Sequence, residues 1–120
     1  MMSDNDSRVL RLFAERVRAL YPDAKILAYG SRARGDATWE SDLDVCVILP
    51  AVTQEMEEKI TYVAWEVGFD NEVLILTVKF DQETFDKQAR GRIPFVNNIL
   101  RDAVAASGIW SSTNTRRGWA

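Results

Sequence analysis

The feature that most constrains this chain is a pair of apolar segments joined by a polar loop with distinctive residues at both ends. Residues 25–29 form an apolar run that ends in a Gly-Ser pair. Residues 42–49 form a second run, which opens with Asp42 and Asp44. Because side chains alternate along a strand, the two carboxylates point to one face, with Cα atoms about 6.6 Å apart. The apolar residues after Asp44 predict a central, buried strand.

The paired carboxylates indicate a metal site. Two unpaired carboxylates at the mouth of a buried strand repel each other and lose hydration, and a divalent cation removes both penalties. An Asp-x-Asp pair alone is usually a solvated strand end, and a Gly-Ser pair alone is usually a turn. At this spacing, the combination predicts a phosphate cradle beside hard oxygen ligands, which phosphoryl or nucleotidyl transfer requires.

Composition narrows the chemistry of such a site. The chain has 120 residues, a net charge of −3, one cysteine and no histidine. Without histidine, Ser-His-Asp catalysis, Cys-His catalysis and His-ligated zinc are excluded, so an oxygen-rich site for Mg²⁺ or Mn²⁺ remains. Cys46 is expected in the core, and a single cysteine without an internal disulfide fits a reducing cytoplasm.

Charge and hydropathy argue against three further classes of protein: nucleic-acid-binding, membrane-spanning and secreted proteins. The net charge is negative and no long basic run is present, so stable nucleic-acid binding is not expected. No apolar run approaches the length of about eighteen residues that a membrane span needs. The polar, acidic N-terminus argues against a secretory signal.

Hydrophobic periodicity predicts one α+β domain over residues 1–109, with a small mixed sheet flanked by helices. A third strand is expected over residues 71–78, and the loop over residues 30–40 has room for a helical turn after Ser31. Trp65 is expected on a helix surface or in an interface, and residues 110–120 are expected to be a flexible tail. Helices are expected over residues 6–20, 53–68 and 81–90, and from residue 94 to Gly108.

The complete motif comprises Gly30, Ser31, the insert Arg32-Ala33-Arg34-Gly35, Asp42 and Asp44. It resembles the signature of the minimal nucleotidyltransferases of the DNA polymerase beta-like superfamily. The resemblance covers about residues 25–104, and its last part depends on residues 94–101, which are similar to the closing helix of many such proteins. It implies a polymerase beta-like nucleotidyltransferase fold, with Mg²⁺ or Mn²⁺ as cofactor and ATP or another NTP as substrate.

Within this resemblance, the glycine-serine turn binds the nucleotide. Gly30 lets the backbone approach a phosphate where a Cβ would collide, and Ser31 offers its hydroxyl and backbone N–H to the β- and γ-phosphates. Arg32 and Arg34 are candidates to clamp phosphates bidentately. Equally, these two arginines can pair with nearby carboxylates of the loop or face a protein partner.

The resemblance also implies the metal ligands. Asp42 and Asp44 would hold the metal, and a third carboxylate on a neighbouring strand would help bind it and activate the attacking hydroxyl. Glu72, expected at the start of the third strand, is the nearest match, although the family usually has Asp there. Asp70, two residues earlier, competes for the role.

Three functions remain open at this point. The first is transfer of an NMP, expected to be AMP from ATP, to a hydroxyl of a partner protein. In the family that the chain resembles, the partner is often a HEPN-domain toxin, so the chain would act as an antitoxin. The second is a catalytically weak binding module that neutralises a partner by covering it. The third is transfer to a small molecule, as in aminoglycoside nucleotidyltransferases, for which a homo-oligomer would have to build the acceptor cleft.

Overall fold

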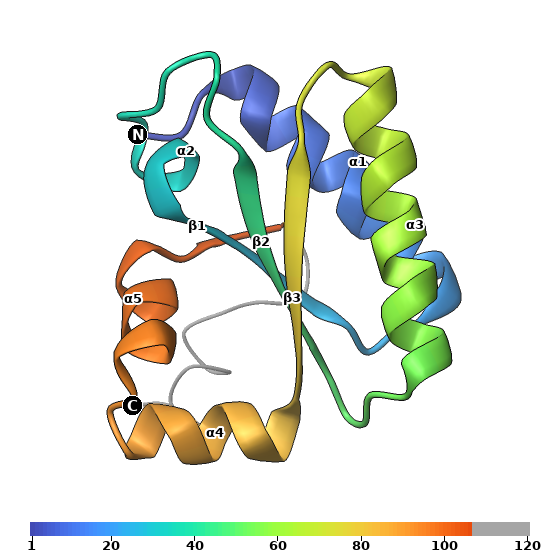
Figure 1. Cartoon of the computed structure of the whole chain (residues 1–120), viewed down its shortest axis with the longest axis vertical. Coiled ribbons are helices and arrows are strands. Elements are labelled where there is room, and N and C mark those ends of the chain that lie inside the picture. The colour runs from blue at the N-terminus through green and yellow to red at the C-terminus, as the bar shows by residue number, and fades with distance from the viewer. Residues whose placement is uncertain (107–120) are drawn as a thin grey trace.

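A four-stranded mixed sheet lies at the centre of the computed structural model, which describes residues 1–106 (Figure 1). The strand order is β3-β2-β1-β4. Strand β2 runs parallel to β3 and antiparallel to β1, and β4 is antiparallel to β1. The fold class is therefore α+β, as predicted. The strands are β1 (Lys25–Tyr29), β2 (Leu43–Leu49), β3 (Ile75–Asp81) and β4 (Val104–Ala105).

Helices cover both faces of the sheet (Figure 1). Three of them begin at a side chain that accepts a hydrogen bond from a backbone N–H three residues later: Ser3, Thr53 and Asp81. Helices α1 and α3 pack on one face, and α4 and α5 pack on the other. The helices are α1 (Asp4–Leu20), α2 (Gly30–Arg34), α3 (Gln54–Asp70), α4 (Gln82–Arg90) and α5 (Pro94–Asp102).

Strand β2 is central and buried on both faces, which confirms the prediction made from its apolar run. Val45 and Val47 pack into the core under α1 and α3. Cys46 and Ile48 alternate with them and pack into the second core, under α4 and α5. Cys46 is a free, fully buried thiol, and burial raises its pKa to about 12, so it is a core residue as expected.

The third strand begins later than predicted. Helix α3 continues to Asp70, and a turn follows in which Glu72 has a positive φ of 58°. The Val73 N–H donates to the Gly68 carbonyl at 3.0 Å, which closes the turn. A Cβ on Gly68 would lie 2.4 Å from the Val73 carbonyl oxygen, so glycine is required for this close approach. The expectation that residues 71–74 belong to the strand is therefore wrong.

The last helix is shorter than predicted. Helix α5 ends at Asp102, and the expectation that it continues through Ala103 and Val104 is wrong. Val104 and Ala105 instead pair with Ala28 and Leu27 to form β4. Gly108 and the predicted tail over residues 110–120 lie outside the described residues. Within residues 1–106, no helix has the length and apolar character needed to cross a bilayer.

Candidate active site

The C-terminal end of β1 and the N-terminal end of β2 lie side by side at one end of the sheet. Antiparallel pairing sets Tyr29 opposite Asp44, and Gly30 follows directly. Gly30 has φ +77°, a conformation that side chains rarely adopt. A Cβ on Gly30 would lie only 2.7 Å from Oδ2 of Asp44. The structure therefore brings the glycine of the turn directly against one of the paired carboxylates, and a larger residue there would have a strained backbone and would displace the Asp44 carboxylate.

Asp42 and Asp44 form an electrostatically coupled pair. Partial burial raises the pKa of Asp44 above its ordinary value, and the neighbouring charge of Asp42 raises it further. Neither carboxylate takes part in an ion pair within residues 1–106. Two coupled carboxylates without a cationic partner match the oxygen ligands that Mg²⁺ and Mn²⁺ prefer. This donor set fits a divalent ion whose other ligands come from phosphate or water.

Two neighbours of Asp44 were not identified from the sequence. Tyr29 lies beside it on β1, and burial, followed by the charges of Asp44 and Cys46, raises the pKa of the Tyr29 hydroxyl to about 12. Phe95 of α5 packs edge-on against Tyr29, with ring centroids 6.0 Å apart. On the other side, Leu76 of β3 is the register partner of Asp44 and is 45% exposed. The alternation of side chains along the strands could be read from the sequence. The register of β3 against β2, which sets Leu76 beside Asp44, could not.

The third carboxylate does not lie where it was expected. Glu72 is an exposed residue in the turn before β3, and Asp70 is the last residue of α3. Within residues 1–106, no three acidic or cysteine side chains come together in a group able to hold a metal ion. The expectation that Glu72 lies at the start of the third strand is therefore wrong, because the chain is still turning at this position.

Ser31 lies in the first turn of the short helix α2, so the predicted helical turn after the first strand is present. The backbone N–H groups of a first turn have no partner within the helix and are free to meet an anion. The Gly35 N–H closes this helix on the Ser31 carbonyl at 3.0 Å. The turn thus holds Ser31 immediately after Gly30 and next to the carboxylate pair.

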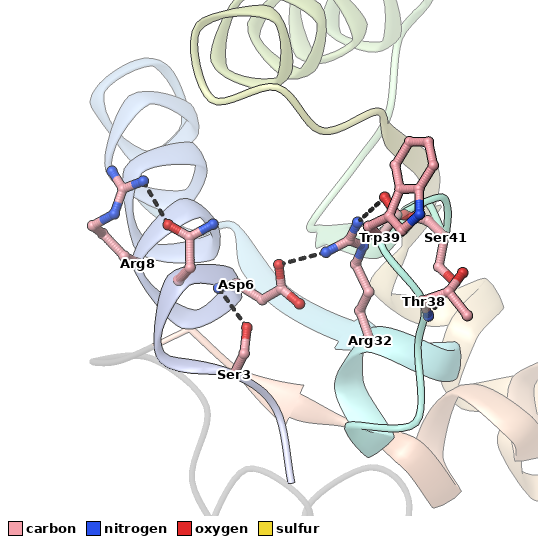
Figure 2. Close-up of polar contacts among 8 residues, drawn as sticks. Ser3, Asp6, Arg8, Arg32, Thr38, Trp39 and Ser41 are labelled. Carbon is pink, nitrogen blue, oxygen red and sulfur yellow. Dashed lines mark hydrogen bonds and ion pairs between the residues drawn. The ribbon is translucent and has the colours of Figure 1, made fainter.

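Arg32 belongs to a structural network (Figure 2). Its Nη1 donates to Oδ1 of Asp6 at 2.8 Å, in an ion pair whose side chains are 13% and 7% exposed. Its Nε donates to the Ser41 carbonyl at 2.6 Å, and its Nη2 to the Trp39 carbonyl at 3.2 Å. The guanidinium therefore ties α1 to the segment that leads into Asp42. In this arrangement Arg32 positions the loop, and its ion pair is with Asp6 of α1 and not with a carboxylate of the loop itself.

Arg34 links α2 to α5. It pairs with Asp102 at 2.8 Å and with Asp36 at 3.2 Å, and the guanidinium is partly exposed. Hydrogen bonds to these two carboxylates raise the pKa of Arg34. The pairing with Asp36 is one of the alternatives that the sequence left open. Both arginines of the motif therefore have carboxylate partners in the folded chain.

Replacing Asp6 by alanine tests the network. The change strands the Arg32 guanidinium in a largely buried position, so the free energy of unfolding is expected to fall by about 3 kcal/mol. Urea denaturation measures this loss. Asp4→Ala is the matched control, because Asp4 is exposed in the same helical turn and its removal is expected to cost less than about 1 kcal/mol. Equal losses in the two variants would contradict a role for the Asp6–Arg32 pair.

Two comparisons with known proteins found a match for this chain. The profile of the nucleotidyltransferase domain family matches residues 10–103. Among solved structures, the chain is similar to a crystal structure described as a candidate nucleotidyltransferase from Sulfolobus solfataricus. The two share 16% sequence identity and a TM-score of 0.48, over 95% of this chain and 85% of the other. No curated protein matches the chain.

Proposed function

We propose that this chain, which belongs to the nucleotidyltransferase domain family, transfers AMP from ATP to a hydroxyl of a partner protein. The partner would be a HEPN-type toxin, which the modification neutralises, so the chain acts as an antitoxin. The observation that carries the proposal is the packing of Gly30 against Asp44, with Asp42 coupled to it and no cation paired with either in residues 1–106. This arrangement supports a site where a metal-bound triphosphate meets a glycine turn.

Each residue at this edge has a defined task in the proposal. Asp42 and Asp44 would hold Mg²⁺ or Mn²⁺, which supplies neutralisation of the triphosphate charge and polarisation of the α-phosphorus. Gly30 lets the backbone lie directly against the Asp44 carboxylate, and Ser31 would donate to a phosphate of the metal-bound nucleotide. Arg32 acts as a positioning residue, because its hydrogen bond to the Ser41 carbonyl fixes the residue next to Asp42.

The surroundings of the site support a protein acceptor. Exposed apolar side chains occupy the same end of the sheet, and they suit contact with a protein surface better than with a free polar molecule. Leu74 and Leu76 lie where β3 begins, and Phe95 packs on Tyr29. Their exposed fractions are 56%, 45% and 44%, respectively.

A binding module is the second candidate, and one observation favours it. Within the described residues, the neighbour of Asp44 on β3 is Leu76, and no third carboxylate joins the pair. A site with two carboxylates binds a metal more weakly than one with three, which would slow transfer. In this reading, the chain neutralises its partner by covering it, and nucleotide is not needed.

The deciding experiment combines the chain, Mg²⁺, ATP labelled at the α-phosphate, and a HEPN-domain protein as the acceptor. We expect label on the partner and a mass increase equal to one AMP, both lost in Asp42→Asn. Inhibition of the partner without ATP, unchanged in Asp42→Asn, would instead identify the binding module. Label found on an added aminoglycoside in the absence of any protein acceptor would identify the small-molecule enzyme.

A further inference from the structure

The solvent-facing side of α3 carries an aromatic ladder that the proposed active site does not use. Tyr62, Trp65 and Phe69 follow at spacings of three and four, so they line one face of the helix. Their rings are stacked, with centroids 6.3 Å apart for the first pair and 5.5 Å for the second. The three residues are 58%, 59% and 73% exposed, in the order named. Large aromatic groups exposed together in this way mark an interaction surface.

The same helix concentrates negative charge. Residues 54–72 contain six carboxylates and one lysine, a net charge of −5, so the rest of the chain carries +2 of the total of −3. The lysine, Lys59, already pairs with Glu55 at 3.1 Å, and Arg16 of α1 pairs with Glu66. Within residues 1–106, Glu58 and Asp70 form no ion pair. The surface therefore has uncompensated negative charge around its aromatic rings.

A groove beside the ladder combines the two features. It has a volume of about 600 Å³ and is lined by Gln54, Glu57, Glu58, Thr61, Tyr62 and Trp65. Lys79 of β3 reaches its edge, where Nζ donates to the Thr61 hydroxyl at 2.5 Å, and it lies close enough to Glu57 for their charges to interact. The lining thus presents two carboxylates and two aromatic rings, with one lysine at the rim.

From this combination, we infer that the α3 face is a docking surface for a basic segment of a partner protein that presents arginine side chains. A guanidinium stacks on the face of a tryptophan and forms bidentate hydrogen bonds with a carboxylate. Trp65 and Glu58 offer both groups in one groove. Apolar side chains of the same partner segment would cover Phe69, which is the most exposed ring of the ladder.

Charge excludes two other occupants of this face. A nucleic acid brings phosphates, which the unpaired carboxylates of this surface repel. A second copy of the chain that placed its own α3 here would bring the same negative charge into contact. An arginine-bearing protein segment satisfies both the charge and the aromatic rings.

The ladder also leads toward the proposed active site. Helix α3 ends at the end of the sheet where β2 begins (Figure 1). The Leu43 N–H donates to the Leu74 carbonyl at 2.9 Å, so the strand that carries Asp44 is joined to the residues that follow α3. A segment bound along α3 would therefore hold its own protein close to that site. Docking itself does not depend on nucleotide transfer.

Calorimetry with synthetic peptides tests the inference on the full chain, without nucleotide. The probes are an amphipathic helical peptide with arginines along one face, a lysine twin and a glutamine twin. We expect the arginine peptide to bind about threefold tighter than the lysine twin and at least about tenfold tighter than the glutamine twin. Trp65→Ala is expected to weaken binding of the arginine peptide about threefold to tenfold, and Glu58→Gln to weaken it in the same direction.

Trp39→Ala is the matched control, because Trp39 is also an exposed tryptophan, at 86%, but lies in the loop before β2. It should leave peptide binding unchanged. Absence of binding, equal binding of the glutamine twin, or binding that Trp65→Ala leaves intact would overturn the inference. Sedimentation of the chain alone provides a further outcome: a dimer that Trp65→Ala dissociates would show that a second copy occupies this face, which also overturns it.

Discussion

Replacing Asp44 by asparagine is expected to lower nucleotide transfer by at least about a thousandfold while making the folded protein more resistant to unfolding. Transfer falls because the amide removes one of the two charges available to hold the metal-bound triphosphate. Stability rises because Asp44 is partly buried beside Asp42, and both conditions disfavour its charged form. In the proposed function, the same carboxylate therefore weakens the empty protein and would serve the reaction.

The pH dependence follows from the raised pKa of Asp44 in the folded state. The contribution of protonated Asp44 to stability is complete below its unfolded-state pKa of about 3.9. That contribution is lost as the pH rises through the higher folded-state pKa. We therefore expect the melting temperature of Asp44→Asn to exceed that of the unaltered chain at neutral pH, and the two to converge near pH 3.

Thermal unfolding over this pH range measures the effect, with transfer assayed on the same samples. Asp36→Asn is the control, since Asp36 is an exposed carboxylate whose partner Arg34 also pairs with Asp102. The melting temperature of Asp36→Asn should show no pH-dependent difference from that of the unaltered chain. Its transfer activity should stay within about twofold. An Asp44→Asn variant that keeps transfer would contradict the site, and one that is less stable at neutral pH would contradict the repulsion between the carboxylates.

The central part of the site was predictable from sequence because it depends on short-range geometry. Strand periodicity puts Asp44 at the exposed end of a buried strand, and the glycine-serine pair ends the preceding strand. Two such strands in sequence pair readily as antiparallel neighbours, which brings Gly30 against Asp44. The central position of β2 followed from its apolar character on both faces.

The parts that failed depend on contacts that are remote in sequence or on backbone turns. Val73 and Leu74 are apolar and continue directly into the strand, but the close approach at Gly68 bends the residues before Ile75 into a turn and removes Glu72 from the sheet. Asp6 lies 26 residues from Arg32, so no local pattern reveals their ion pair. Strand β4 has two residues, too few for any periodic signal.

The register of β3 explains how the site differs from the one that the resemblance implied. Leu76 is the parallel partner of Asp44, so side chains at these two positions lie next to each other on one face of the sheet. A carboxylate at position 76 would complete a group of three, and the chain has leucine there. Because Leu76 is 45% exposed, replacing it costs little apolar burial.

Leu76→Asp is therefore expected to create a stronger metal site. The third carboxylate adds a ligand beside Asp44, so affinity for Mn²⁺ should rise at least about tenfold, measured by calorimetry without nucleotide. Without metal, the added charge repels Asp44, so the melting temperature should fall in the presence of a chelator and recover when Mn²⁺ is added. Ile93→Asp is the control, because it places the same charge at a residue of similar exposure before α5. Equal Mn²⁺ affinity in the two variants would mean that Leu76 and Asp44 do not share a ligand sphere, and the two-carboxylate site proposed here would lose its geometric basis.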